Sequence, residues 1–125
     1  MNLFSVKTIK NLLKKYGAKP SRRFGQNFLV DKGAARKILE AADLAKEDAV
    51  LEIGPGIGTI TQELAERVKK VTAVEKDRNM VEILKQTLKG SGNVEIIQGD
   101  ILKIENWKLI KNPYKVVGNL PFYIA

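Results

Sequence analysis

The stretch AVLEIGPGIGT, residues 49–59, decides the fold class of this 125-residue chain. Its first five residues are apolar apart from Glu52, as in a strand buried on both faces, and glycines follow before a helical pattern begins. A strand, a glycine turn and a helix in this order open a crossover unit of a parallel sheet. We therefore expect an α/β fold.

The same alternation continues towards the C-terminus. Further strands are predicted at 71–75, 94–98 and 115–118, separated by two helices and the turn 90–93. Ile57, Ile60, Leu64 and Val68 mark the first helix, and Met80, Val81, Leu84 and Leu88 mark the second, with Asp77 as its N-cap. Four strands make half of a doubly wound sheet. No fifth strand follows, so we expect a fold that is truncated after about the fourth strand.

Two helices are predicted before this sheet. In the first, Ile9, Leu12, Leu13 and Tyr16 recur at helical spacing, lysines occupy the other side, and Gly17 ends the helix. In the second, Asp31 is the N-cap, and Ala34, Ala35, Ile38, Leu39 and Ala42 point inward. We expect a basic N-terminal segment over 1–30 and a partial cofactor-binding domain over 31–125.

Positive charge is concentrated at the N-terminus. The first 37 residues carry ten basic side chains and one acidic side chain, whereas the rest of the chain is nearly neutral. A basic segment of this kind favours RNA or DNA as the partner, because neutralising phosphates releases counterions. A solvated helix face, or a mitochondrial presequence, has a similar composition.

Composition excludes several kinds of chemistry. The chain has no cysteine and no histidine, so disulfides, thiolate catalysis and the commonest general base are absent. No apolar run approaches the roughly 18 residues that span a bilayer. We expect a cytoplasmic protein that uses neither a metal nor a membrane.

The glycine turn and a later acidic residue predict a nucleoside cofactor. Gly54 and Gly56 let a ligand approach the backbone, and Glu75, at the end of the next strand, can accept the ribose hydroxyls. The spacing G-x-G-x-G differs from the dinucleotide spacing G-x-G-x-x-G and favours S-adenosylmethionine over NAD. Asp100 can accept the adenine amine of the cofactor, although it can equally be a helix N-cap.

The segment Asn119-Leu120-Pro121-Phe122 follows the fourth strand and is the predicted catalytic segment. The amide oxygen of Asn119 and the main-chain carbonyl of Leu120 can accept both hydrogens of an adenine amine and turn its lone pair towards a methyl donor. Pro121 biases Leu120 towards an extended conformation. Phe122 offers a face for stacking of an extruded base, although a single aromatic residue at this place is more often core.

The ordered motifs of the chain resemble the rRNA adenine N6-dimethyltransferase family, which includes KsgA-type housekeeping enzymes and Erm resistance enzymes. The resemblance runs from about residue 19 to residue 125 and is carried by RFGQNFL at 23–29, LEIGPG at 51–56, VE at 74–75, GD at 99–100 and NLPF at 119–122. Phe122 stands where members often carry tyrosine.

This resemblance implies a Rossmann-like, class I methyltransferase domain that uses S-adenosylmethionine and releases S-adenosylhomocysteine. It implies cofactor binding by Asn27, Leu29, Gly54, Gly56, Glu75, Asp100 and Asn119. The motifs look closer to the KsgA branch, which dimethylates adenosines of small-subunit rRNA during ribosome assembly, than to the Erm branch, which acts on large-subunit rRNA.

Members of the family continue through further strands and a helical domain. We therefore expect this chain to bind cofactor, to methylate poorly, and to self-associate through the exposed edge of its fourth strand. A nicotinamide-dependent oxidoreductase and a non-catalytic RNA-binding assembly module are the competing hypotheses.

Overall fold

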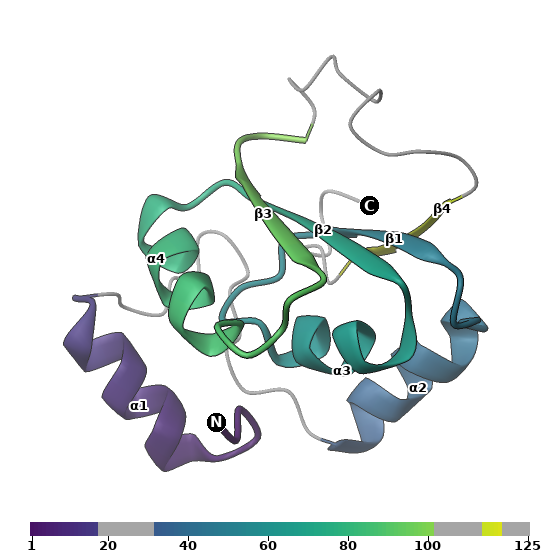
Figure 1. Cartoon of the computed structure of the whole chain (residues 1–125). Helices are drawn as coiled ribbons and strands as arrows, with labels where there is room; N and C mark the ends of the chain where they lie inside the picture. The colour runs from purple at the N-terminus through teal and green to yellow at the C-terminus, as the bar shows by residue number, and fades with distance from the viewer. Residues whose placement is uncertain (18–31, 102–113, 119–125) are drawn as a thin grey trace.

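A computed structural model describes residues 1–17, 32–101 and 114–118 (Figure 1). The described chain forms four helices and four strands in the order α1, α2, β1, α3, β2, α4, β3, β4. The helices are α1 (Val6–Lys15), α2 (Lys32–Ala42), α3 (Thr59–Arg67) and α4 (Arg78–Thr87). The strands are β1 (Ala49–Ile53), β2 (Lys70–Glu75), β3 (Val94–Gln98) and β4 (Tyr114–Gly118). The expected α/β class is confirmed.

All strand pairs in the sheet are parallel, and the strand order is β3-β2-β1-β4. Successive crossovers carry the chain from β1 to β2 and then to β3, whereas β4 lies on the opposite side of β1. The strand order therefore changes direction beside β1. In open α/β sheets, ligands bind at such a change of direction, beyond the carboxyl ends of the strands.

Two helices cover one face of the sheet around a shared apolar cluster. Ala35 of α2 and Leu64 of α3 pack with Val50, Val71 and Val117 of three adjacent strands. Figure 1 shows α2 and α3 side by side under the sheet. Since alternate strand residues point to one face, these valines of β1, β2 and β4 all point to the face that α2 and α3 cover.

Helix α1 packs on α4 rather than on the sheet (Figure 1). Its apolar residues Ile9, Leu12 and Leu13 are buried in a cluster that also contains Met80 and Ile83 of α4. Ser5 caps the start of α1 by accepting a hydrogen bond from the Thr8 amide, and Tyr16 and Gly17, which has φ 64°, end it. The predicted basic amphipathic helix is therefore confirmed, and its apolar face is occupied.

The sequence predicted most of these elements correctly, but it assigned the buried Ile57 to the wrong element and wrongly expected Ala34 to be buried. Ile57 lies in the turn before α3, which begins only at Thr59, and it packs into the α1 cluster. Ala34 is exposed, and its neighbour Ala35 is the residue of this helical turn of α2 that faces the core. Strands β2 and β4 begin one residue earlier than predicted. The predicted cap Asp31, and the division at residue 30, lie outside the described residues.

Asp77 caps α4 as predicted, because its carboxylate accepts hydrogen bonds from the Asn79 amide at 2.8 Å and the Met80 amide at 3.3 Å. In the part of the chain that the structure describes, no helix is long and apolar enough to cross a membrane.

Candidate functional site

The candidate site lies where the parallel strands end. Ile53, Glu75, Gln98 and Gly118 are the last residues of β1, β2, β3 and β4, and all four therefore lie at one edge of the sheet. The glycine turn leaves this edge after Ile53. Apart from Asn27 and Leu29, the residues assigned to the site lie at or directly after these four strand ends.

The glycine turn has free space beside Gly54 and Gly56 among the described residues. Gly54 and Gly56 adopt φ values of 67° and 60°, in the left-handed region that side chains disfavour. A Cβ atom at either position meets no described atom within 4 Å. Glycine is therefore required here by backbone conformation, and the absent side chains leave the main chain of the turn accessible.

Gly58 serves a different purpose, because it is closely packed. A Cβ atom there lies 2.8 Å from Thr87 Oγ1 and 3.1 Å from Leu84 Cδ2, and the φ of Gly58 is 94°. The Thr87 hydroxyl donates a 2.8 Å hydrogen bond to the Ile57 carbonyl, and Gln62 Nε2 donates a 2.9 Å bond to the Thr87 carbonyl. These contacts fix the turn against the end of α4.

Glu75 connects β2 to the glycine turn. Its Oε1 accepts a hydrogen bond from the Gly56 amide at 3.2 Å, and its Oε2 accepts one from the Asp77 amide at 2.7 Å. Burial raises the pKa of the Glu75 carboxyl, and these backbone hydrogen bonds partly oppose that rise. The predicted ribose acceptor therefore lies beside the glycine turn, and its role in ribose binding stays a prediction. A carboxylate has about four lone-pair sites, so acceptor capacity remains for a ligand.

A second buried carboxyl lies beneath the turn. Glu52 of β1 is 3% exposed and accepts a hydrogen bond from the hydroxyl of Thr61 on α3, which is fully buried. Burial raises the pKa of Glu52 to about 7; the Thr61 hydrogen bond opposes this rise, and the charge of Glu75 adds to it. Sequence reasoning missed this pair, although a single charge in an apolar strand was a visible sign of it.

Asp100 lies at the same edge. The Gly99 amide donates a 2.9 Å hydrogen bond to the Glu75 carbonyl, so the backbone just before Asp100 continues the pairing of β2 with β3. The Asp100 carboxylate also lies 3.8 Å from Lys76 Nζ. Gly54, Gly56, Glu75 and Asp100 are thus brought together, and the role of Asp100 towards an adenine stays a prediction.

The remaining predicted site residues lie outside the described residues. Asn27 and Leu29 fall within 18–31, and Asn119, Leu120, Pro121 and Phe122 fall within 119–125. The last described residue before the second segment is Gly118, which is paired with Ile53 in the β1–β4 register. The chain therefore reaches residue 119 from a position beside the start of the glycine turn.

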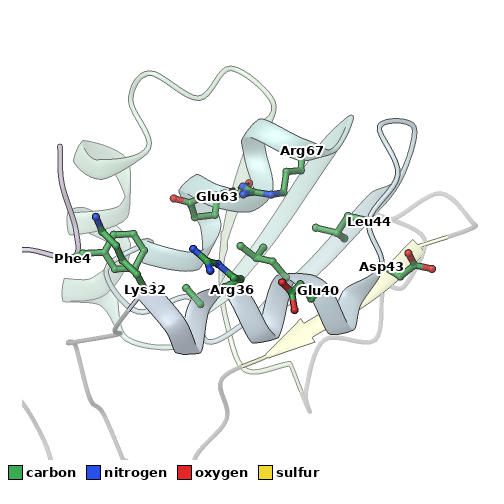
Figure 2. A pocket seen from close by; sticks show the side chains of 10 residues that line it. Phe4, Lys32, Arg36, Glu40, Asp43, Leu44, Glu63 and Arg67 are labelled. Carbon is green, nitrogen blue, oxygen red and sulfur yellow. Dashed lines mark hydrogen bonds and ion pairs between the residues drawn. The ribbon is translucent and has the colours of Figure 1, made fainter.

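A separate groove lies between α2 and α3 and encloses about 670 Å³ (Figure 2). Figure 2 shows Arg36 and Glu40 of α2 on one side and Glu63 and Arg67 of α3 on the other. Arg67 pairs with Glu63 at 2.8 Å. The residues that line this groove include none of the predicted site residues, and its charges are mixed.

Comparison with known proteins gives one consistent family. The family model described as "Ribosomal RNA adenine dimethylase" matches residues 17–125. The chain is 44% identical over 128 residues to a protein named "Ribosomal RNA small subunit methyltransferase A" from Alkaliphilus metalliredigens, a match that covers 98% of this chain and 45% of the relative. A protein of the same name from Lachnoclostridium phytofermentans is 50% identical over 110 residues, a match that covers 83% of this chain and 38% of the relative.

Solved structures agree with this assignment. The 23S rRNA methyltransferase ErmE superposes with a TM-score of 0.70 and 38% identity, over 78% of this chain and 39% of ErmE. A dimethyladenosine transferase from Plasmodium falciparum superposes with a TM-score of 0.65 and 31% identity, over 76% of this chain and 34% of that structure.

The chain spans less than half the length of these relatives. The family model nevertheless covers most of the chain, and the parallel sheet, the glycine turn and the acid at the end of β2 lie within it. The chain belongs to the ribosomal RNA adenine dimethylase family.

Proposed function

We propose that this chain carries the cofactor-binding part of an enzyme that dimethylates N6 of adenosines in small-subunit ribosomal RNA, using S-adenosylmethionine, during assembly of the subunit. The observation that carries the proposal is the hydrogen bond from the Gly56 amide to Glu75, which places a buried carboxylate beside an open glycine turn. A nucleoside needs both features, one for its ribose and one for close approach to the backbone.

The residues present fit S-adenosylmethionine. Gly54 and Gly56 leave the turn free of side chains, and the free lone pairs of Glu75 can accept ribose hydroxyls. Thr59 Oγ1, at the start of α3, is buried and has no hydrogen-bond partner among the described residues. An unpaired buried hydroxyl is costly, so a polar ligand group within its reach is stabilised. The cofactor supplies an electrophilic methyl group on a sulfonium.

Asn119 and Leu120 have the orienting role in this proposal. The Asn119 amide oxygen and the Leu120 carbonyl accept the two hydrogens of the adenine amine, which directs the nitrogen lone pair at the methyl carbon. With S-adenosylmethionine bound, the amine nitrogen would take the methyl group as the methyl–sulfur bond breaks, and the amine would then lose a proton to water. Phe122 stacks on the extruded base. This chemistry needs no strong base, which suits a chain without histidine.

Small-subunit RNA is favoured over large-subunit RNA as the substrate. The curated relatives with 42–50% identity carry the small-subunit name, whereas the Erm enzyme is 38% identical. In the assay, the protein in its full natural length is incubated with radiolabelled S-adenosylmethionine and with unmethylated small or large ribosomal subunits. We expect label in an adenosine of the small subunit. Label confined to the large subunit supports an Erm-type enzyme and contradicts this proposal.

Two further experiments test the oxidoreductase and the non-catalytic assembly module. Calorimetry with this chain is expected to give binding of S-adenosylmethionine and none of NAD; the reverse result supports an oxidoreductase. In the longest natural form, Asn119→Ala is expected to abolish methylation while RNA binding persists. Absence of methylation by the unaltered protein supports the non-catalytic assembly module.

A further inference from the structure

We propose that the lysine face of α1, defined as Lys7, Lys10 and Lys14, is a binding surface for the phosphate backbone of RNA, separate from the site that receives the target adenosine. This inference rests on the proposed function, since ribosomal RNA is the polyanion that the enzyme meets. It adds a second contact point to that function and names the residues that make it.

The three lysines form one stripe. They are spaced three and four residues apart, so they project from the same side of the helix over about 10 Å of its length. All three side chains are exposed. Ile9, Leu12 and Leu13 occupy the opposite side and are buried. The helix is therefore held by its apolar side while its cationic side faces solvent.

No nearby carboxylate in the sequence neutralises this face. The first acidic residue of the chain is Asp31, so α1 and its flanks carry positive side chains only. Lys7, Lys10 and Lys14 form no ion pair with a described residue, as holds for several other cations, whereas five cations elsewhere in the described chain are paired. The paired cations are Arg67, Lys70, Lys76, Lys85 and Lys115. A row of exposed lysines without an ion pair among the described residues is complementary to a row of phosphates.

An anionic membrane is the competing partner for a basic amphipathic helix, because such a helix inserts its apolar side into the lipid. In this structure that side is already packed against Met80 and Ile83, in the cluster that also holds Ile57. Leaving α4 to enter a bilayer exposes this cluster to water. The geometry therefore favours a partner that needs charge alone, which is RNA.

The position of α1 relates this surface to the candidate site. Ile57 directly follows the glycine turn at Gly56, and Met80 lies in the first turn of α4, shortly after Glu75. The apolar side of α1 thus packs against the residue that follows Gly56 and against the first turn of α4, close to the carboxyl ends of β1 and β2. RNA held on the lysine face contributes affinity without reading sequence.

The test compares two triple variants that lose the same charge. Lys7→Gln/Lys10→Gln/Lys14→Gln removes the lysine face, and Lys46→Gln/Lys69→Gln/Lys89→Gln removes three exposed lysines from scattered loops. The probe is a fluorescent 20-nucleotide oligouridine, which lacks adenosine and cannot occupy the target site. Its Kd is measured by anisotropy over a range of KCl concentrations, with circular dichroism as the check on folding.

We expect the α1 variant to bind at least tenfold more weakly at low salt. We also expect the slope of log K against log salt to fall in magnitude by about 2, because three single-strand phosphate contacts are lost at about 0.7 each. The scattered variant is expected to stay close to the unaltered chain. Equal losses in both variants, or no oligouridine binding by the unaltered chain, overturn the inference. Binding of phosphatidylglycerol vesicles in place of oligouridine also overturns it.

Calorimetry with S-adenosylmethionine keeps this inference separate from the proposed function. Both triple variants are expected to bind the cofactor as the unaltered chain does, since all six lysines are exposed and the Gly56–Glu75 hydrogen bond involves none of them. Failure of all three proteins to bind it contradicts the proposed function and leaves the oligouridine result to be judged by itself.

Discussion

The Gly56 amide donates a hydrogen bond to the Glu75 carboxylate across 3.2 Å, and this bond joins β2 to the turn that follows β1. The two residues are 19 positions apart in the chain. Their contact means that the acid holds the turn in shape, and in the proposed function its remaining acceptor capacity binds the ribose hydroxyls of the cofactor. Substitution of Glu75 is therefore expected to change the affinity for the cofactor, and substitution of the residues that pack around the turn and the strands is expected to change the stability of the fold.

Glu75→Gln is expected to weaken S-adenosylmethionine binding by about 10-fold to 100-fold. The glutamine side chain has one acceptor oxygen in place of two, so it cannot replace both hydrogen bonds from the backbone amides. It also lacks the negative charge, and a hydrogen bond to a charged group is worth about 1.5–3 kcal/mol. Calorimetry with the cofactor measures the change. Glu95→Gln on β3 is the matched control, since Glu95 is exposed and pairs only with Lys70 among the described residues. Equal affinity in both variants contradicts a ligand role for Glu75.

Glu52→Gln is expected to flatten the pH dependence of stability between about pH 4.5 and 7. The folded pKa of Glu52 is raised to about 7 from an ordinary 4.5, so the folded state retains a proton that the unfolded state has lost. Stability from this group is complete below pH 4.5 and falls as the pH rises to 7, by about 3 kcal/mol at most. The side-chain oxygen of glutamine still accepts the hydrogen bond from Thr61, but the amide does not titrate.

Urea unfolding at pH 5 and at pH 8 measures the Glu52 effect. Glu75 titrates in the same direction, because burial raises its pKa as well, but it is present in both proteins and largely cancels in the comparison. We expect the unaltered chain to lose more stability between the two pH values than the variant does. An identical loss in both shows that Glu52 has an ordinary pKa.

Gly58→Ala is expected to destabilise the chain by about 2–3 kcal/mol. The added Cβ lies 2.8 Å from Thr87 Oγ1, and alanine at φ 94° is strained. The matched control is Gly92→Ala, where a Cβ meets nothing within 4 Å. Denaturant midpoints measure both changes. Adding Thr87→Ala to the Gly58 variant removes the closest contact and leaves the backbone strain and the 3.1 Å approach to Leu84 Cδ2, so the double variant is expected to be less destabilised than the sum of the two single variants. Strict additivity contradicts the steric explanation.

Asn93→Ala is expected to cost about 1–3 kcal/mol. The Asn93 side chain donates hydrogen bonds to the carbonyls of Ala65 at 2.9 Å and Val68 at 3.0 Å, and so holds the end of α3 to the start of β3. Its loss leaves carbonyls at the end of α3 without this partner. Asn79→Ala, at an exposed position on α4, is the control and is expected to change stability by less than about 0.5 kcal/mol. Denaturant midpoints measure both changes. Similar midpoints for the two variants contradict a stabilising role for the Asn93 side-chain hydrogen bonds.

Much of the fold was predictable from the sequence, because its signals are local. The apolar run before Gly54, the cap at Asp77 and the spacing of Ile9, Leu12 and Leu13 each specify an element through neighbours along the chain. The same holds for the family, since the motifs are short and contiguous. The boundary of α3 was missed because three glycines delay the helix to Thr59 and leave Ile57 free to pack elsewhere.

Sequence alone thus determined the fold class, the order of the described elements and the family, and it predicted Gly54, Gly56, Glu75 and Asp100 as site residues, which the structure places at the carboxyl ends of the strands. Tertiary structure alone decided which of those residues meet and what surrounds them. It placed Glu75 against Gly56, buried Glu52 beside Thr61, and turned the apolar side of α1 onto α4 so that its lysines face solvent. The physical reason is that capping and periodicity act between chain neighbours, whereas burial, pKa shifts and steric contacts depend on residues brought together by packing.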